Sequence, residues 1–312
     1  MISIKIYQSE DKEIWDSFVN KSKNATFLFY RDYMDYHADR FQDYSLMIFK
    51  KDVLVALFPA NIKDEIIYSH QGLTYGGLLL SAQSTTTEVL EIFEQICLHI
   101  KALNIKKIIY KCVPHIYSKY PAQEDLYALF RLNAQRIACH ISSTIVQANP
   151  IAFIESRKSG VRKAKRNELS IIKDDKFDSF WKILNDNLRE KYDTKPVHSI
   201  DEITLLRNKF PQNIEHYLVV DKDKKPVAGT VMYLSDKVAH VQYISSTIEG
   251  RNVGALDFLF DHLINDVYKT KIYFDFGQST EEMGNYLNNS LIFQKEGFGG
   301  RGVVYEVYEI IL

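Results

Sequence analysis

Apolar residues in the first half of the chain recur with the spacings that distinguish strands from helices. Residues 3–7 alternate between apolar and polar, which predicts a strand. Residues 11–21 and 85–103 carry apolar side chains at helical spacing, which predicts two amphipathic helices. Apolar runs bounded by polar turns predict strands at residues 45–50, 53–61, 66–69 and 106–112, and the aromatic-rich stretch 27–41 favours a short helix.

The second half shows the same succession of helical and strand patterns. Helices are predicted at residues 177–192 and 199–209, and the second has Ser199 as N-cap with Glu202 three positions later, the spacing of a capping box. Strands 215–221, 226–235 and 238–246 follow, then a loop at 247–253 and a helix at 254–268. A strand at 271–276, a helix near 281–288 and a strand at 303–310 complete the prediction.

The two halves repeat one order of elements. Residues 46–60 and 218–232 both consist of a strand, a charged turn and a second strand with a small residue. Each is followed by a strand, a glycine-containing loop, an amphipathic helix and a further strand pattern. A chain of 312 residues has room for two domains, so we predict two copies of one α/β fold, covering residues 1–150 and 151–312 with a boundary near 149–158.

Composition narrows the range of partners. The 39 basic and 40 acidic residues give a formal charge of −1, so nothing global calls for DNA or an anionic membrane. The three cysteines have no CxxC spacing, which argues against a disulfide framework and a metal site. The N-terminus lacks a signal-peptide pattern, and no apolar run approaches the roughly 18 residues of a spanning helix. We therefore expect a cytoplasmic protein without membrane insertion.

The segment after residue 240 has the pattern of an anion-binding site. A predicted strand at 240–244 leads into the loop 249–255 and then a helix. A glycine loop that opens a helix presents backbone N–H groups and the positive end of the helix dipole to a phosphate. An ordinary loop and N-cap is the alternative interpretation. The candidate donor-binding residues are Arg251, Asn252, Val253, Gly254 and Ala255.

This strand, R-x-x-G-x loop and helix resemble the acyl-CoA-binding unit of the GNAT acyltransferases, although the family prefers a small residue where Leu256 stands. The patterns Phe274–Gly277, 279–281 and 294–301, and Pro196–Ser199 before a helix, resemble the Fem-like and BioF2-like branch. The resemblance covers the second half. It implies an α/β (α+β) fold of two tandem GNAT-like domains, each a mixed, mostly antiparallel sheet flanked by helices, with acyl-CoA, most often acetyl-CoA, as co-substrate and no metal.

In such folds two parallel strands diverge and the donor lies between them, which we expect at residues 243–246 and 272–276. A backbone N–H there stabilises the oxyanion of acyl transfer, and a base removes the proton of the amine acceptor. His240, Tyr243 and Asp275 are the catalytic candidates. His240 as an ordinary strand histidine and Tyr243 as a core residue are the alternatives, whereas the position of Asp275 at a strand end favours function.

One position departs from the family pattern. Many GNAT enzymes have a tyrosine, the acid that protonates the leaving group, four residues before a Gly-Phe pair. Phe293 stands at that spacing before Gly297–Phe298 and has no proton to give. Either Tyr286, Tyr305 or water replaces it, or the chemistry follows the Fem-like pattern.

Further polar residues near these motifs are candidates for binding the acceptor. His198 precedes a helix, Gln242 lies on the strand of His240, and Lys295 and Arg301 flank three glycines. Solvated loop charges and an N-cap neighbour are the alternatives. Residues 157–166 contain six basic residues and no acid, which favours a polar helix face and leaves open a contact with a CoA phosphate or tRNA.

Three functions compete. The first is an N-acyltransferase that moves an acyl group from acyl-CoA to an amino group of a small acceptor, such as a sugar, nucleotide-sugar or cell-envelope precursor. The second is a Fem-like aminoacyl-tRNA-dependent transferase. The third is a non-catalytic module that keeps the fold, and Phe293 is its best support.

Overall fold

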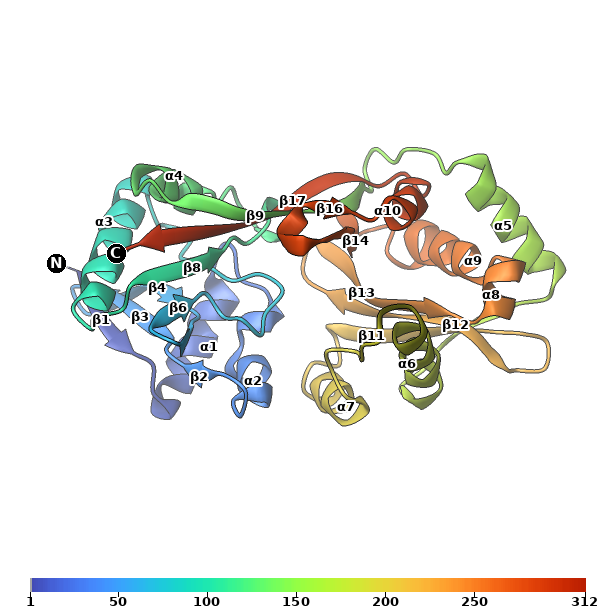
Figure 1. Cartoon of the computed structure of the whole chain (residues 1–312), viewed down its shortest axis with the longest axis horizontal. Helices are drawn as coiled ribbons and strands as arrows, with labels where there is room; N and C mark the ends of the chain where they lie inside the picture. Colours follow the sequence, from blue (N-terminus) through green and yellow to red (C-terminus); the bar gives the residue numbers. More distant parts are fainter. Residues whose placement is uncertain (1) are drawn as a thin grey trace. The chain divides into compact units, whose positions relative to one another are not determined.

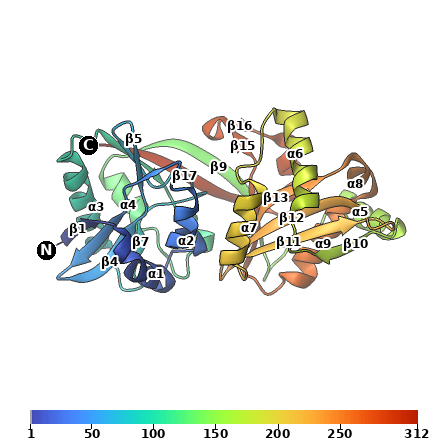
Figure 2. The ribbon, with the colours of Figure 1, turned by 90° about the horizontal axis from the view of Figure 1, so that it is seen from below.

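The computed structural model describes residues 2–312, and the chain divides into two compact units (Figures 1 and 2). Unit 1 takes the chain up to His140 together with Thr280–Tyr286 and Val304–Leu312. Unit 2 comprises Ile141–Ser279 and Leu287–Val303. Two units were expected, but as contiguous segments that meet near residue 150.

Unit 1 contains two sheets and four α-helices. The sheet orders are β1-β3-β4-β7 and β17-β8-β6-β5-β2. Helix α3 forms because Thr85 caps it and because Val89, Ile92 and Ile96 share one apolar face, which packs into the core. The elements are β1 (Ile2–Ile6), α1 (Lys12–Lys21), α2 (Arg31–Met34), β2 (Gln42–Asp43), β3 (Leu46–Lys50), β4 (Val53–Phe58), β5 (Asn61–Lys63), β6 (Ile66–Tyr68), β7 (Leu79–Leu80), α3 (Thr86–Lys101), β8 (Lys107–Lys111) and α4 (Glu124–Arg131).

Unit 2 has one sheet in the order β10-β11-β12-β13-β14-β9. Figure 1 shows α5 and α9 on one face of this sheet and α6 and α7 on the other. The predicted capping box of Ser199 and Glu202 is present at the start of α7. The elements are α5 (Glu155–Arg166), β10 (Ser170–Lys173), α6 (Asp178–Tyr192), α7 (Ile200–Lys209), β11 (Ile214–Val220), β12 (Pro226–Leu234), β13 (Val238–Ser246), α8 (Ile248–Val253), α9 (Ala255–His262), β14 (Tyr273–Gln278) and α10 (Asn289–Glu296).

Each unit is completed by a strand that begins in the other. Strand β9 (Gln135–Val146) starts in unit 1, and its last residues pair with β14 in unit 2. Strand β17 (Arg301–Ile311) starts in unit 2, and its last residues pair with β8 in unit 1. Among the strand pairs within the units, β6–β8 and β13–β14 are parallel and the others antiparallel, which confirms the expected mixed, mostly antiparallel sheets.

The helix predicted near residues 281–288 is wrong. That segment consists of β15 (Thr280–Glu281), a turn and β16 (Tyr286–Leu287), and the helix begins only at α10. Gly284 has a φ of 97°, which a helix does not accommodate, and the Asn288 side chain caps α10 by accepting from the Leu291 N–H. Within residues 2–312, no helix is long and apolar enough to span a bilayer.

Candidate functional site

The site in unit 2 begins where β13 and β14 stop pairing. Their parallel ladder joins Val238 to Tyr273 and ends with His240 opposite Asp275. Both strands continue, β13 to Ser246 and β14 to Gln278, so they diverge beyond these two residues. A divergence of two parallel strands is therefore present, but on β14 it begins after Asp275, since residues 273–275 of the expected segment 272–276 are paired; His240 and Asp275 lie at its base.

A β-bulge determines which side chains accompany His240. Opposite β12, Tyr243 pairs with Val231 and Val241 with Met232, so Gln242 is the extra residue. Without the bulge, an odd spacing would direct Tyr243 and His240 to opposite faces. The bulge restores them to one face, the face on which Gly229 of β12 packs under Phe180 of α6.

Asp275 is the centre of a buried hydrogen-bond network. Its carboxylate is fully buried and accepts from Ser142 Oγ, from Thr144 Oγ1 at 2.7 Å and from His240 Nδ1 at 2.7 Å. Burial favours the neutral acid, but these hydrogen bonds and the charge of His240 outweigh it and lower the pKa of Asp275 to about 2. Asp275 is thus a carboxylate at neutral pH that fixes the orientation of the His240 ring.

The other edge of the His240 ring faces Gly277. A β-carbon at Gly277 would lie 3.2 Å from His240 Cε1 and 3.8 Å from Nε2, so a side chain at this position would cover that edge. Gly277 has a φ of 74°, a left-handed conformation that favours glycine. Glycine therefore avoids a side chain against this edge of the ring at the point where the strands diverge.

Lys295 supports the same strand end from α10. Its side chain is buried, and Nζ donates to the carbonyl oxygens of Gly277 at 2.9 Å and Gln278 at 2.6 Å. Burial lowers the pKa of Lys295 to about 8, while the charge of Asp275 opposes this shift. Lys295 is therefore not a solvated loop charge, whereas Arg301 is exposed and donates to the Gly300 carbonyl at 2.6 Å.

His198 contacts strand β13 through Tyr243. The Tyr243 hydroxyl lies 2.5 Å from His198 Nδ1 and accepts from the His198 backbone N–H at 3.3 Å. The Trp181 indole N–H donates to the His198 carbonyl at 3.1 Å. His198 and Trp181 line a pocket of about 800 Å³ between the end of α6 and the start of α7.

The expected phosphate-binding loop has a different structure. Residues Arg251, Asn252 and Val253 belong to the short helix α8, whose Thr247 side chain caps the Gly250 N–H. The N–H groups of Arg251 and Gly254 donate to backbone carbonyls of the same segment. The Arg251 guanidinium donates to Asn187 Oδ1 and to the Ser246 carbonyl.

Helix α5 covers the start of α9. A β-carbon at Gly254 would lie 2.4 Å from the carbonyl oxygen of Gly160, and Ala255 is fully buried. Arg157 of α5 forms an ion pair with Asp257 in the first turn of α9, at 2.6 Å. The glycine at 254 is thus required by close packing of two helices, a role that sequence pattern does not distinguish from phosphate binding.

Sequence reasoning did not identify Ser142, Thr144 or Trp181. The two hydroxyl residues lie on β9, whose polar run 142–144 gave no strand signal. Trp181 was assigned to an apolar helix face, and its indole N–H gives it a second role. The described residues include no cluster of three or more histidine, cysteine, aspartate or glutamate side chains suited to a metal.

Comparison with solved structures identifies the fold. The chain matches the crystal structure of FemX with a TM-score of 0.69 at 10% identity, covering 99% of this chain and 97% of that one. The chain has a tandem GNAT-like fold. L-PGS from Bacillus licheniformis matches with a TM-score of 0.62 at 10% identity (97% and 93% covered), and a tandem GNAT protein from the clavulanic acid biosynthesis pathway with 0.53 at 8% (100% and 98%). No protein-family model and no curated protein matches the sequence.

Unit 1 also contains a pair of parallel neighbouring strands, β6 and β8. The space beyond their paired residues is filled. The ladder runs to Tyr68 and Ile109. A β-carbon at Gly76 would lie 1.8 Å from the Ser69 carbonyl oxygen, just after β6, and one at Gly77 would lie 2.8 Å from the Tyr110 hydroxyl on β8. The Gly76–Gly77 backbone therefore occupies the space between the two strand ends.

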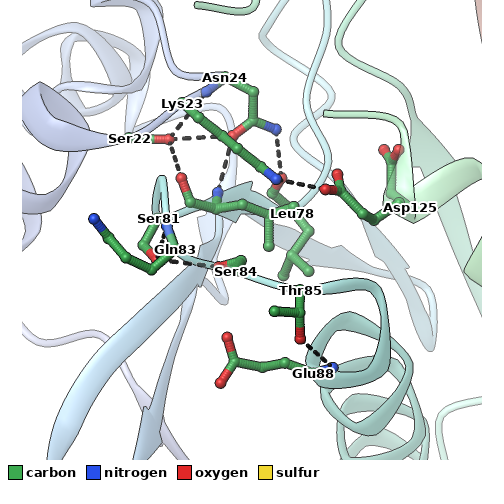
Figure 3. A network of polar contacts seen from close by, with 12 residues as sticks. Ser22, Lys23, Asn24, Leu78, Ser81, Gln83, Ser84, Thr85, Glu88 and Asp125 are labelled. Carbon is green, nitrogen blue, oxygen red and sulfur yellow. Dashed lines mark hydrogen bonds and ion pairs between the residues drawn. The ribbon is translucent and has the colours of Figure 1, made fainter. Parts of the chain in front are cut away.

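Polar contacts hold this segment in place (Figure 3). Asn24 Nδ2 donates to the Leu78 carbonyl and Asn24 Oδ1 accepts from the Leu80 N–H, both at 2.9 Å. The Leu78 N–H donates to the Tyr110 hydroxyl at 2.8 Å, which donates to Asp125 at 2.9 Å. Burial raises the pKa of Asp125 to about 6. In unit 1, Tyr110 of β8 is thus used to bind the chain's own backbone, and Asp125 of α4 holds the Tyr110 hydroxyl in place.

Proposed function

We propose that the protein is a transferase that moves an acyl group from an activated donor to an amine, and that the reaction takes place where β13 and β14 diverge in unit 2. The His240–Asp275 pair at the base of this divergence carries the proposal. The corresponding gap in unit 1 is filled by Gly76–Gly77, which supports a site in unit 2 alone.

The geometry supports His240 as the general base. Asp275 accepts the proton on Nδ1, so Nε2 is the ring nitrogen that receives a proton from the attacking amine. The amine nitrogen forms a bond to the acyl carbon, the carbonyl oxygen becomes an oxyanion, and the bond to the leaving group then breaks. The low pKa of Asp275 keeps the counter-charge that stabilises an imidazolium at His240.

The bulge supports a position for the oxyanion. A bulge leaves one residue outside the regular ladder, so its backbone groups are turned away from the neighbouring strand. The bulge at Gln242 lies two residues beyond His240, and Thr230 Oγ1 holds the next carbonyl, that of Tyr243, at 2.7 Å. We assign the backbone N–H at the bulge as the hydrogen-bond donor to the oxyanion.

Two donor classes remain, and the structure favours an aminoacyl ester on tRNA. The N–H groups of Arg251 and Gly254 are engaged within their own segment and α5 covers Gly254, so the usual pyrophosphate contacts have little support. Helix α5 carries exposed Lys158, Lys163 and Lys165 on its surface, which suits a polyanion. Acyl-CoA is the second candidate, because the strands diverge as in an acyl-CoA site and one structural neighbour is a tandem GNAT protein, whose structure is described as without AcCoA.

The test presents radiolabelled acetyl-CoA and radiolabelled aminoacyl-tRNA, separately, with a panel of amino sugars, nucleotide amino sugars and peptides. We expect transfer from one donor class, and a loss of about 100-fold or more in His240→Ala. His262→Ala is the matched control, because His262 forms a similar 2.9 Å contact with Asp266 on the exposed surface of α9. Full activity of His240→Ala would refute the proposed base, and labelling by neither donor would refute the transferase.

A further inference from the structure

The proposed reaction also needs an acid, and the usual one is missing. Phe293 stands at the family's tyrosine position, is 60% exposed and has no hydroxyl. The two tyrosines considered as replacements, Tyr286 and Tyr305, belong to unit 1 rather than to the unit of the His240–Asp275 pair. The Tyr305 hydroxyl is buried against that of Tyr117 at 3.0 Å.

Tyr243 is a tyrosine that the fold brings to the face of the sheet on which His240 lies. The bulge at Gln242 places its ring on the same face of β13 as His240, two cross-strand pairs further along. The ring of Trp181 packs edge-on against it, with centroids 5.2 Å apart, and so fixes its direction. A phenol is a suitable acid for a thiolate or alkoxide leaving group, since its ordinary pKa is near 10.

His198 is arranged to return the proton to Tyr243. Nδ1 lies 2.5 Å from the phenol oxygen, and the His198 backbone is held on both sides, by its N–H to that oxygen and by its carbonyl to the Trp181 indole. The His198 side chain is almost entirely buried, yet the residue lines the pocket of about 800 Å³. A pocket of this size holds water, so His198 connects the phenol to solvent.

We propose that Tyr243 is the general acid of the reaction and that His198 reprotonates it from the pocket. The inference rests on the proposed acyl transfer. As the bond between the acyl carbon and the leaving sulfur or oxygen breaks, the Tyr243 proton moves to that atom. The proton on His198 Nδ1 moves to the phenolate oxygen, and His198 takes a proton from water in the pocket. The proton that the amine gave to His240 leaves separately, so charge and atoms balance.

The experiment compares two donors of one acyl group that differ in leaving group. One is acetyl-CoA or aminoacyl-tRNA, whichever supports transfer in the test above and is called the natural donor below, and the other is the p-nitrophenyl ester, whose phenolate leaves without protonation. In Tyr243→Phe we expect turnover of the natural donor to fall about 100-fold and that of the nitrophenyl ester to fall only a few-fold. Tyr217→Phe is the matched control, since it also removes a buried, hydrogen-bonded hydroxyl in unit 2.

Equal losses with both donors would overturn the assignment, because a purely structural role does not depend on the leaving group. His240→Ala separates the two proposals: it should slow both donors, whereas Tyr243→Phe should spare the nitrophenyl ester. Should Tyr243→Phe fail to fold, fluorotyrosine at position 243 provides a second measurement. Its more acidic phenol should move the basic limb of the kcat profile to lower pH, and an unmoved limb would overturn the proposal.

Discussion

Asp275→Asn removes the buried charge of the candidate site while preserving the size of the side chain. The carboxylate has no exposed surface, and its pKa is lowered from 3.8 to about 2 by the network around it. Each unit of pKa difference between the folded and unfolded states corresponds to about 1.4 kcal/mol. Ionised Asp275 therefore contributes on the order of 2 kcal/mol to folding at neutral pH.

The sign of this contribution determines its pH dependence. Because the folded pKa lies below the unfolded one, the stabilisation is fully present above the unfolded pKa and is lost as the pH falls toward the folded pKa. The advantage of the wild type over Asp275→Asn should therefore shrink below pH 4. By pH 3 about 1 kcal/mol of it should have disappeared.

Urea unfolding at pH 7, 5, 4 and 3 measures this difference. The protein has two tryptophans, Trp15 in unit 1 and Trp181 in unit 2, so fluorescence in a Trp15→Phe background reports on unit 2. Asp257→Asn is the control, because burial raises the pKa of Asp257 and the pH trend should reverse. An Asp275 advantage that stays constant from pH 7 to pH 3 would refute the charged network.

Two further variants test the remaining assignments. Asn24→Leu leaves the Leu78 carbonyl and the Leu80 N–H without their partner, so calorimetry should show that the free energy of unfolding of unit 1 falls by roughly 2–5 kcal/mol. Transfer by the folded protein should be unchanged. A second equivalent of bound donor in the wild type would contradict the filled gap in unit 1. Replacing Lys163 and Lys165 by glutamine should weaken tRNA binding and reduce the slope of log K against log salt by about 1.5–2, and an unchanged slope would exclude α5 as the contact.

Regular apolar periodicity accounts for the parts of the fold that the sequence predicted. Strand β13 was predicted with its observed bounds, and α7 with its cap, because both patterns are local. Strand β9 was missed, since its polar residues face a buried carboxylate that only tertiary structure supplies. Helix α10 was placed too early because Gly284 and Asn288 determine its start more strongly than apolar spacing does.

The sequence identified several residues of the candidate site but not the contacts between them. His240 and Asp275 were each selected as catalytic candidates, and the structure joins them by a hydrogen bond. The proximity of His198 to Tyr243 depends on the bulge, which no periodicity reveals. The sequence pattern around Gly254 indicated a phosphate-binding loop. In the structure, the carbonyl oxygen of Gly160 packs against Gly254 and excludes a side chain there.

The reciprocal strands β9 and β17 also determine when the protein can fold during synthesis. Unit 1 lies mostly in the first half of the sequence, yet β8 receives its neighbour from Val307–Ile311, which are synthesised after all of unit 2. Unit 2 in turn needs Thr144, which is made before the rest of it. The nascent chain therefore holds an open β8 edge until residues 307–311 have been synthesised. A fragment that starts at residue 151 would lack both the β9 strand and the hydroxyl that binds Asp275.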